Sequence, residues 1–375
     1  MDVTFLDAVF TAPGPYATVC ADVTHNTETA DTELELKVRA ITEELTAGGA
    51  PGPVVDAVRS QLLQANEGGQ LATLRGRALI VAADGSVVLD EALADSPRDP
   101  VVTWSPDPAL LPVLRQLAGR VPHVIVIADR VGADVLVASG TGQQLETEQV
   151  DGGTFHMRKV QVGGWAHNTY MHTAENQWEE NAGKVAGAVH DVVIRDHSRF
   201  VLLAGDVRAR QLIADKASQE VSEVLVTMDG GGRAAGADRE VITARATELV
   251  AENEAAETTR VLEQVEAASA HGLAITGTAL VVEALRKAQV ETLVLADRPD
   301  DEQLHAGPGA LELGVSAEDV AALGVTDAHQ VPADLGMLRA AIGSSAAVVV
   351  VPRSAMPGDI PVAAVLRYTD DSTPH

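Results

Sequence analysis

A cationic and aromatic segment around a Gly-Gly pair contains the residues of this chain that are best suited to contact an anionic partner. The candidate binding residues are His156, Arg158, Lys159, Gly163, Gly164, Trp165, His167, Asn168 and Tyr170. The two glycines permit backbone conformations that are forbidden to other residues, and they allow close approach to a surface. Trp165 beside them offers a large flat face, and Arg158 and Lys159 supply positive charge. We therefore expect a reaching loop mounted on a rigid support.

A metal site is an alternative function for the same segment. His156, His167, His172 and Glu175 carry imidazole and carboxylate groups, which suit zinc and other transition ions. Their spacing matches no standard signature, and the sequence contains no HExxH motif. We interpret them as polar residues on an exposed loop, where protonated histidines still contribute to anion contacts. No metal ligand is predicted.

The sequence motifs that mark enzymes give no catalytic site. The chain has no GxSxG motif, and no pair of acids stands out from its general acidity. The glycine-rich run 229–236 follows a predicted strand and precedes a predicted helix, as nucleotide-binding loops do. It lacks the Lys-Ser/Thr pair and the GxGxxG spacing, so an interdomain turn is favoured. Cys20 is the only cysteine, which excludes an internal disulfide and a cysteine-based zinc site. We predict no catalytic residue and no cofactor.

Asp206, Arg208 and Arg210 form a secondary candidate site. They follow an apolar stretch, 200–204, that is typical of a buried strand. Side chains at the ends of such strands commonly reach a binding site in α/β proteins. The favoured alternative is an ion pair that caps a structural turn.

A long amphipathic helix is the predicted support of the loop. After Trp178, apolar residues recur at helical spacing at positions 182, 185, 186, 189 and 193. Glu180 and Lys184 stand four residues apart, an offset at which opposite charges stabilise a helix. One face of this helix should therefore pack against a core, so that the helix holds the loop that precedes it.

The other elements indicate an α/β fold with several domains, since 375 residues exceed what one core usually organises. The hydrophobic content of 46% is mostly aliphatic, because aromatic residues make up only 3%. The fold class predicted is three α/β domains, comprising residues 1–118, 119–238 and 239–375. Two strands around a turn are predicted at 124–140, and single strands at 16–23, 77–82, 200–204, 224–228, 292–296, 346–351 and 362–368. Helices are predicted at 32–45, 54–64, 239–269 and 280–287. The proline-rich run 96–112 is predicted to be a connector.

The net charge of −27 argues against loose binding to phosphate backbones, which depends on many Lys and Arg side chains. Residues 151–216 differ from the rest, because they carry eight basic and eight acidic groups and five of the eleven histidines. Contact with an anionic partner is therefore expected there. Asp2 and Asp7 stand where a signal peptide needs positive charge, and no apolar run is long enough to cross a bilayer. We predict a cytoplasmic protein without membrane contact.

Several segments, in order along the chain, resemble one family, the bacterial relatives of the archaeo-eukaryotic class-one release factors and Pelota. Three segments resemble the family's middle domain. VIVIADRVGADVLVASG is similar to its opening hairpin, GGWAHNTYMHTAENQWEENAGKVA to its loop and following helix, and FVLLAGDVRAR to a later strand. The C-terminal domain is similar to GLAITGTALVVEALRKAQVETLVLADRP and the closing AAVLRY. Within the family, the chain resembles the dormancy-associated actinobacterial group related to the hibernation factor Balon. The resemblance implies three domains arranged as in Pelota.

The chain departs from this family at the catalytic loop. Release factors carry Gly-Gly-Gln there, whereas this chain has Gly163, Gly164 and Trp165. The glutamine that orients the hydrolytic water is missing, so the resemblance implies a factor that occupies the A site of idle ribosomes under stress without hydrolysing peptidyl-tRNA. It implies rRNA, tRNA and ribosomal proteins as partners, and elongation factor Tu as a further one. Trp165 and Tyr170 would then stack on unpaired bases, which is worth roughly 1 to 3 kcal/mol per base. Packing of Trp165 in a core is an equal alternative.

A literal Gly-Gly-Gln does occur at residues 68–70, in the first predicted domain. With 32 glycines in the chain, chance alone gives such a tripeptide with a probability of roughly 0.1. It lies between a predicted helix and a predicted strand, so we interpret it as a connecting loop.

Two other functions stay open. The first is a release or rescue factor that hydrolyses peptidyl-tRNA with other groups, such as His167 or Asn168. The second is a stress protein that binds a non-ribosomal partner or a metal through the same loop.

Overall fold

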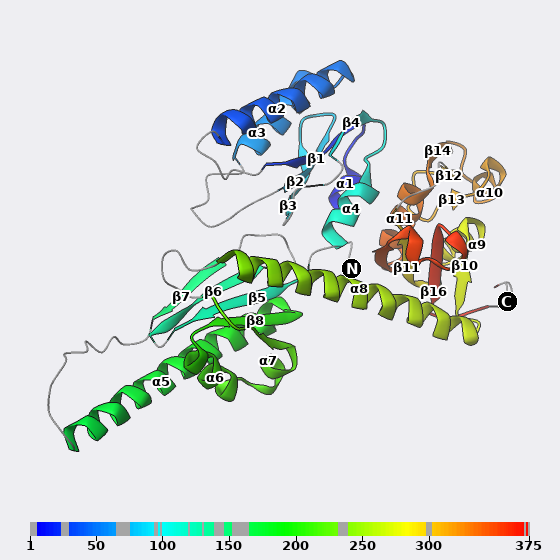
Figure 1. Ribbon diagram of the computed structural model, residues 1–375. Coiled ribbons are helices and arrows are strands. Elements are labelled where there is room, and N and C mark those ends of the chain that lie inside the picture. Colours follow the sequence, from blue (N-terminus) through cyan, green and yellow to red (C-terminus); the bar gives the residue numbers. More distant parts are fainter. Residues whose placement is uncertain are drawn as a thin grey trace. The chain divides into compact units, whose positions relative to one another are not determined.

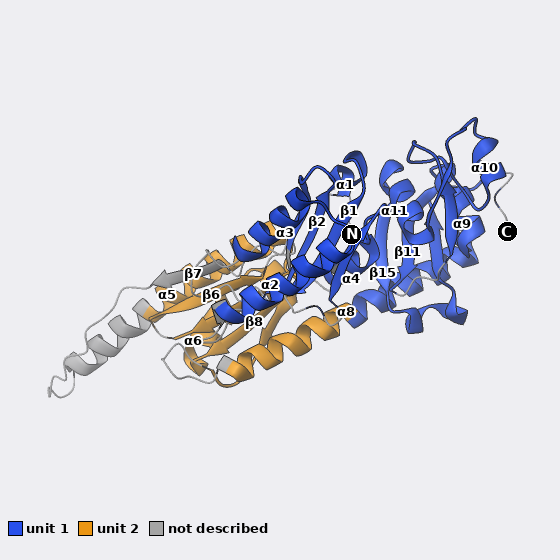
Figure 2. Ribbon diagram, turned by 90° about the horizontal axis from the view of Figure 1, so that it is seen from above, with its two compact units in different colours: residues 1–68, 73–119, 255–375 blue, residues 69–72, 120–254 orange. Residues whose placement is uncertain are grey.

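The chain forms two compact units in a computed structural model. Unit 1 comprises residues 1–68, 73–119 and 255–375, and unit 2 comprises residues 69–72 and 120–254 (Figure 2). The structure describes residues 6–23, 30–64, 76–93, 97, 100–118, 121–129, 131–138, 146–151, 165–231, 239–297, 302–370 and 373. Within these ranges, the side chains of residues 30, 31, 92, 118, 146–151, 165–177 and 239 lie outside the description.

Unit 2 is built on a five-stranded sheet with the order β7-β6-β5-β8-β9. Its strands are β5 (His123–Ala128), β6 (Gly132–Ala138), β7 (Glu146–Asp151), β8 (Phe200–Gly205) and β9 (Leu225–Thr227). The first three pair in antiparallel fashion, whereas β8 runs parallel to β5, and β9 parallel to β8. Parallel neighbours need a crossover connection. The helix α5 (Trp165–Asp196) lies between β7 and β8 in the chain, and α6 (Val207–Lys216) and α7 (Gln219–Val224) lie between β8 and β9.

Helices cover both faces of the unit 2 sheet (Figure 1). Successive side chains of a strand point to opposite faces. Val124 and Val126 of β5 therefore join a core with α5, α6 and α7, while Ile125 and Ile127 join a second core with the first half of α8 (Arg239–Ala270). A strand that is apolar on both faces is typical of a sheet buried between two helical layers.

The first part of unit 1 is an antiparallel sheet with the order β3-β2-β1-β4. Its strands are β1 (Tyr16–Asp22), β2 (Gly76–Ala82), β3 (Val87–Leu93) and β4 (Val101–Ser105). The helices α2 (Ala30–Ala47) and α3 (Gly52–Gln64) pack on the face that carries Val19 and Val81. The opposite face packs against α1 (Asp7–Thr11) and α4 (Leu110–Ala118), and it includes Cys20, whose pKa is raised to about 12 by burial.

The second part of unit 1 contains two more sheets. One has the order β10-β16-β11-β15 and the other the order β13-β12-β14. Their strands are β10 (Ala274–Thr276), β11 (Val290–Ala296), β12 (Gln303–Ala306), β13 (Leu313–Gly314), β14 (His329–Pro332), β15 (Ala347–Val351) and β16 (Val362–Leu366). The helices are α9 (Thr278–Arg286), α10 (Ala317–Ala321), α11 (Ala333–Gly343) and the 3-10 turns η2 (Arg353–Ala355) and η3 (Pro357–Asp359). Val261 and Val265, in the second half of α8, pack on Val294 and Val365.

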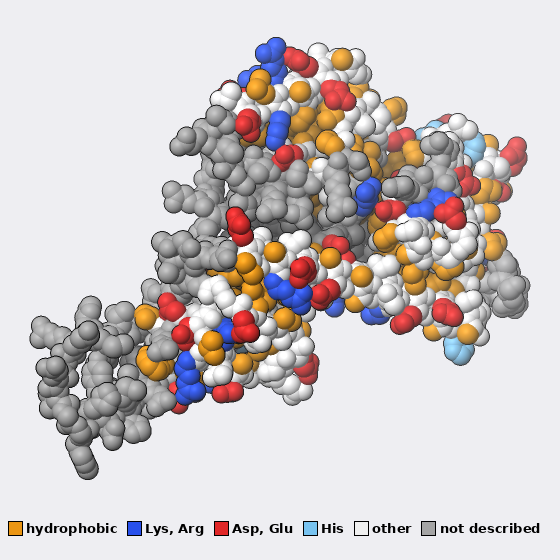
Figure 3. Space-filling view, viewed as in Figure 1, with side chains coloured by type: hydrophobic (Ala, Val, Ile, Leu, Met, Phe, Trp, Pro, Cys, Tyr) orange, Lys and Arg blue, Asp and Glu red, His pale blue; other side chains and the backbone are white. Residues whose placement is uncertain are grey.

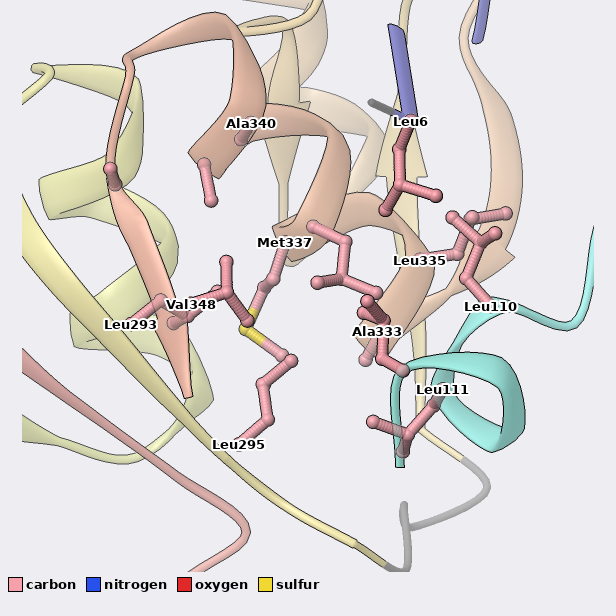
Figure 4. Packing of buried hydrophobic residues seen from close by; sticks show 14 of the residues in the cluster. Leu6, Leu110, Leu111, Leu293, Leu295, Ala333, Leu335, Met337, Ala340 and Val348 are labelled. Atoms are coloured by element: carbon pink, nitrogen blue, oxygen red, sulfur yellow. The ribbon is translucent and has the colours of Figure 1, made fainter. Parts of the chain in front are cut away.

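One hydrophobic core joins the two parts of unit 1. In Figure 4, Leu110 and Leu111 of α4 face Ala333 and Leu335 at the start of α11. Further along α11, Met337 extends toward the strands β11 and β15, where Leu293, Leu295 and Val348 lie near it. Burial of one such side chain contributes roughly 1.5 to 3 kcal/mol. Unit 1 therefore holds together residues from the beginning and the end of the chain.

The α/β fold class predicted from the sequence is confirmed. The helices predicted at 32–45, 54–64 and 239–269 correspond to α2, α3 and α8, and the apolar strands correspond to β1, β2, β8, β11, β15 and β16. The chain turns at Asp84 and Gly85 between β2 and β3, with a positive φ of 86° at Gly85. The division into three domains stays a prediction. Unit 1 combines most of the first and third predicted domains, whereas residues 239–254 of the third belong to unit 2.

The prediction of a connector at 96–112 is wrong for much of that run. Residues 101–105 form β4, which pairs with β1 at the edge of its sheet. Pro112 lies in the first turn of α4, where its missing N–H costs nothing because no intrahelical acceptor is available there. The prolines at 106 and 108 separate these two elements. The prolines of this run therefore stand between an edge strand and the start of a helix.

Candidate functional site

The segment with the predicted binding residues is only partly described. His156, Arg158, Lys159, Gly163 and Gly164 lie outside the described residues. Trp165, His167, Asn168 and Tyr170 belong to α5, and of these residues only the backbone is described. Their roles in binding therefore stay predictions.

The expected loop is shorter than predicted, because α5 begins within its C-terminal part. Trp165 is the first residue of the helix, and His167, His172 and Glu175 lie within it. The physical reason is local, because no proline or glycine occurs between Gly164 and Gly183, so the helix continues back to the Gly-Gly pair. At roughly 1.5 Å per residue, its 32 residues span about 48 Å.

This helix start adds an electrostatic feature to the predicted site. The first N–H groups of a helix have no intrahelical acceptor, and the helix dipole places about half a positive charge there. Gly163 and Gly164 directly precede that end in the sequence, and Arg158 and Lys159 lie a few residues before them. The N-terminus of α5 thus supplies positive potential directly after the Gly-Gly pair.

The second half of α5 is firmly packed, as the sequence predicted. Ala182, Val185, Ala186, Val189 and Val193 are all buried. Asn181 is buried beside them at 4% exposure, and it lines a cavity of about 10 Å³ together with Trp178 and Asp129. That volume holds about one water molecule and no larger ligand. The helix is therefore anchored to the sheet through its C-terminal half.

The secondary candidate site is a strand-to-helix junction at the end of β8. The Asp206 carboxylate accepts hydrogen bonds from the backbone N–H groups of Arg208, at 3.0 Å, and Ala209, at 3.1 Å, so it caps α6. Gly205 before it has a φ of 111°, and a Cβ there would lie 2.0 Å from the carbonyl oxygen of Ala128. The chain turns in this place because only glycine allows the close approach to β5.

Arg210 closes this junction from the first turn of α6. Its Nε donates to the Gly205 carbonyl oxygen at 3.2 Å, and its guanidinium forms an ion pair with Asp229 at 2.7 Å. The Arg210 side chain is 9% exposed, whereas that of Asp229 is 98% exposed. An ion pair is therefore present at this turn, between Arg210 and Asp229, whereas the prediction placed it within Asp206, Arg208 and Arg210. Asp206 and Arg210 both serve the turn, and a binding role for them and for the exposed Arg208 stays a prediction.

Asp229 is the residue of this junction that the sequence analysis missed. In the sequence, Asp229 is the first residue of the glycine-rich run 229–236, which starts just after β9 and is interpreted as an interdomain turn. A signal was available, because β8 and β9 are parallel, and the carboxyl ends of parallel strands meet at one edge of a sheet. An acid after one strand and an arginine after the next are therefore expected to meet.

Several cations of unit 2 are already paired with acids. Lys184 pairs with Glu180 at 2.9 Å, Arg195 with Asp196 at 2.9 Å, and Lys216 with Glu179 at 3.9 Å. On the face seen in Figure 3, Lys and Arg side chains of the described residues stand among Asp and Glu. Exposed pairs of this kind add only about 0 to 1 kcal/mol of stability, but they reduce the positive potential around them. Phosphate contacts by Arg158 and Lys159 stay a prediction, because these two residues lie outside the described ranges.

Two further findings concern the described residues. None of their His, Cys, Asp and Glu side chains gather in a group of three or more that would hold a metal ion. Among the helices in the described ranges, none has the length and apolar character needed to cross a bilayer.

Residues 122–271 match the model of a protein family described as Bacterial archaeo-eukaryotic release factor family 2. The match extends from β5 to the end of α8, so it includes the Gly-Gly-Trp segment and the Asp206 junction. This part of the chain is thus similar to release-factor-like proteins of bacteria.

Over nearly its whole length, the chain is similar to two proteins of Mycobacterium tuberculosis. These are the uncharacterized proteins Rv2629 of strain H37Rv and MT2704 of strain CDC 1551, each 28% identical over 361 residues, which cover 95% of this chain and 94% of the relative. Among solved structures, the archaeal translation termination factor aRF1 is 15% identical, with 97% of this chain and 96% of that chain covered and a TM-score of 0.28. Dom34 of S. cerevisiae, a translation termination-like factor, is 11% identical, with 80% of each chain covered and a TM-score of 0.42. Because both TM-scores are low, nothing about the arrangement of this chain follows from them.

Proposed function

We propose that this protein is a ribosome-binding translation factor that occupies the A site of idle ribosomes and does not hydrolyse peptidyl-tRNA. The observation that carries the proposal is the release-factor family match over residues 122–271, in a chain whose Gly-Gly pair is followed by Trp165 instead of glutamine. Without the glutamine, the segment lacks the group that orients water in release factors, while the Gly-Gly pair and the nearby Arg158 and Lys159 are present in the sequence. Occupancy of the site is the function that remains.

The described part of unit 2 supports this proposal in physical terms. The anchored C-terminal half of α5 gives a rigid base for the helix, and the N-terminus of α5 adds positive potential where an RNA phosphate would approach. Binding energy for RNA then comes from few local contacts, and the acidic remainder of the chain disfavours indiscriminate binding to polyanions. We further propose that the protein binds ribosomes that hibernate under stress and that elongation factor Tu is a partner.

Ribosome binding is tested by sedimentation of the full chain with purified bacterial 70S ribosomes at several salt concentrations. The double variant Arg158→Ala, Lys159→Ala is expected to weaken binding and to lower the slope of log affinity against log salt by about 1.5, since two phosphate contacts are lost. The matched control is Lys184→Ala, Arg195→Ala, which removes two positive charges that are already paired in unit 2. Equal losses in the two double variants would mean that net charge, and not this segment, determines binding.

The A-site assignment is tested by competition with aminoacyl-tRNA on ribosomes that carry a peptidyl-tRNA in the P site. The protein is expected to displace aminoacyl-tRNA, and Trp165→Ala should weaken it about 5- to 150-fold if the indole stacks on a base. Core packing of Trp165 predicts a different result, namely a lower melting temperature of Trp165→Ala at unchanged intrinsic affinity.

Peptidyl-tRNA release decides between occupancy and hydrolysis. The wild-type protein is expected to release no more peptide than buffer. Trp165→Gln restores Gly-Gly-Gln and is expected to raise release above that background. Release by the wild-type protein that is lost in His167→Ala or Asn168→Ala would instead establish the alternative of a hydrolytic rescue factor.

A further inference from the structure

Unit 1 contains a cavity of about 260 Å³. Residues near β1 and the turn 106–108 line one side of it, and residues of the β12 to α11 region line the other. These two sides come from the beginning and the end of the chain, which the core shown in Figure 4 holds together. The cavity is therefore part of one packed unit.

Two side chains of opposite charge line this cavity, and neither has an ion-pair partner among the described residues. Arg339 of α11 donates to the backbone carbonyl oxygens of Gly307, at 2.9 Å, and Pro308. These contacts hold its guanidinium in place but leave its charge uncompensated, and a guanidinium has five N–H donors. Asp107, in the turn before α4, is half-buried, and no described side chain donates a hydrogen bond to its carboxylate.

The environment of Asp107 is unfavourable for a bare carboxylate. Burial raises the pKa of Asp107, and the nearby His329 offsets part of this rise. Tyr16 does not serve as a donor to it, because its hydroxyl already donates to the carbonyl oxygen of Ala12 at 2.6 Å. A half-buried charge without a hydrogen-bond donor costs free energy, which a ligand with a positive group would recover.

The remaining walls of the cavity are largely apolar. Phe10, Leu313, Val331 and Leu335 line it, together with the ring of Tyr16. Its volume is just below the range of about 300 to 1,000 Å³ in which drug-sized ligands bind. A nucleotide is too large and too negative for a site with a single arginine, whereas a small molecule with one positive end, one negative end and a short apolar body matches both the charges and the walls.

We propose that this cavity binds a free apolar α-amino acid, with its ammonium group on Asp107 and its carboxylate on Arg339. The two contacts are of the charge-assisted kind, which are about twice as strong as neutral hydrogen bonds, and the Arg339 fork suits a planar carboxylate. The side chain of the amino acid packs among the apolar walls. Because Asp107 belongs to the first part of unit 1 and Arg339 to the second, the bound amino acid links the two parts and stabilises the unit by mass action.

The test is isothermal titration calorimetry and thermal unfolding of the full chain with millimolar L-leucine, L-methionine and L-phenylalanine. Two analogues of leucine each lack one charge, namely 4-methylpentanoate, without the ammonium group, and 3-methylbutylamine, without the carboxylate. We expect at least one of the three amino acids to bind and to raise the melting temperature. For leucine, affinity should exceed that of either analogue by about tenfold or more. No heat and no stabilisation with any of the amino acids would overturn the proposal, as would equal affinity for leucine and both analogues.

Variants then assign the two charges. Asp107→Asn is expected to weaken leucine binding about tenfold or more and to leave the affinity for 4-methylpentanoate unchanged, since only the ammonium contact is lost. The control Asp327→Asn removes an exposed carboxylate near His329 and should bind leucine like the wild type. Circular dichroism verifies that each variant is folded. Wild-type affinity of Asp107→Asn for the bound amino acid would contradict the assigned contact and, with it, the proposal.

Discussion

The Asp206 junction of unit 2 and the cavity of unit 1 both contain an aspartate and an arginine, but they use these charges differently. At the junction, Asp206 accepts from two backbone N–H groups, and Arg210 binds a carbonyl oxygen and Asp229. In the cavity, Asp107 and Arg339 line the same space without an ionic partner among the described residues. Charge at the end of a strand or in a turn therefore indicates a binding site only where the fold has not already satisfied it.

The comparison also separates two sources of stability. The junction contributes to folding, because its polar groups complete a turn that the backbone of Gly205 requires. The cavity keeps a carboxylate in a half-buried place at some cost in stability. Substitutions at the junction should therefore lower the free energy of unfolding, whereas neutralising the carboxylate of the cavity should raise it.

The largest effect is expected for Gly205→Ala. Its Cβ would overlap the carbonyl oxygen of Ala128, and a φ of 111° is strained for any residue with a side chain. Unit 2 should lose about 4 kcal/mol or more, measured by native-state hydrogen exchange of the β5 and β8 amides. The control is Gly187→Ala on α5, where the new methyl group meets no atom within 4 Å. That change should stabilise the helix by roughly 0.5 to 1 kcal/mol. Similar exchange in both variants would show that β8 does not need its glycine.

Arg210→Met comes next, at a cost of about 2 kcal/mol by the same exchange measurement. Methionine keeps most of the buried volume, so the loss reports the unpaired carbonyl oxygen of Gly205 and the broken ion pair. The paired experiment is Asp229→Asn, which should cost less than about 1 kcal/mol because that side chain is almost fully exposed. If Asp229→Asn cost as much as Arg210→Met, the ion pair and not the carbonyl contact would dominate.

Asp206→Ala is expected to cost about 1 kcal/mol, the usual value of a helix N-cap. The loss should appear in the amides of α6, because Asp206 accepts from the N–H groups of Arg208 and Ala209. Asp206→Ser retains a capping oxygen and should restore most of the stability. Failure of serine to do so would indicate that the charge of Asp206, and not its cap, is required.

The smallest effect, with the opposite sign, is expected for Asp107→Asn. Burial raises the pKa of Asp107 in the folded protein, so the folded protein binds this proton more tightly than the unfolded chain. The stabilisation from this proton is complete below the pKa of Asp107 in the unfolded chain, and it is lost as the pH rises through the pKa of Asp107 in the folded protein. Without ligand, the variant should be more stable than the wild type at neutral pH by less than about 1 kcal/mol, given the solvent screening of a half-exposed group.

Thermal unfolding at neutral pH and at about pH 3 measures this difference, which should vanish below the unfolded pKa, where the carboxylate is protonated in both states. Tyr16, His329 and Arg339 line the cavity together with Asp107 and are the same in both proteins, as is Asp334, whose pKa burial also raises. A more stable wild type at neutral pH would mean that the Asp107 carboxylate has a stabilising partner, against the assignment of an open charge.

Much of the fold was predictable from local patterns. The apolar positions after Trp178 are buried as their spacing predicted, because a helix that packs on a sheet must bury one stripe. The strands β8 and β15 were visible as short apolar runs. The small sheet β13-β12-β14 and the helix α11 were not predicted, since their apolar residues show no clear period when neighbours bury several sides at once.

The candidate sites divide in the same way. The Gly-Gly-Trp segment and the aspartate after β8 were found by type and position alone. Asp229 was missed although the parallel order of β8 and β9 would have placed it. Asp107 and Arg339 had no signal in the sequence, because they lie far apart in the chain and belong to no motif.

The amino-acid sequence by itself determined the α/β class, the rigid helix after the Gly-Gly pair, the balanced charge of residues 151–216 and the replacement of glutamine by Trp165. These features depend on residue type and local spacing. Only the tertiary structure decided which charges are satisfied, namely Asp206 by backbone amides and Arg210 by Asp229, and which remain open, namely Asp107 and Arg339. The physical reason is that desolvation and hydrogen bonding are set by neighbours in space, and the sequence does not name those neighbours.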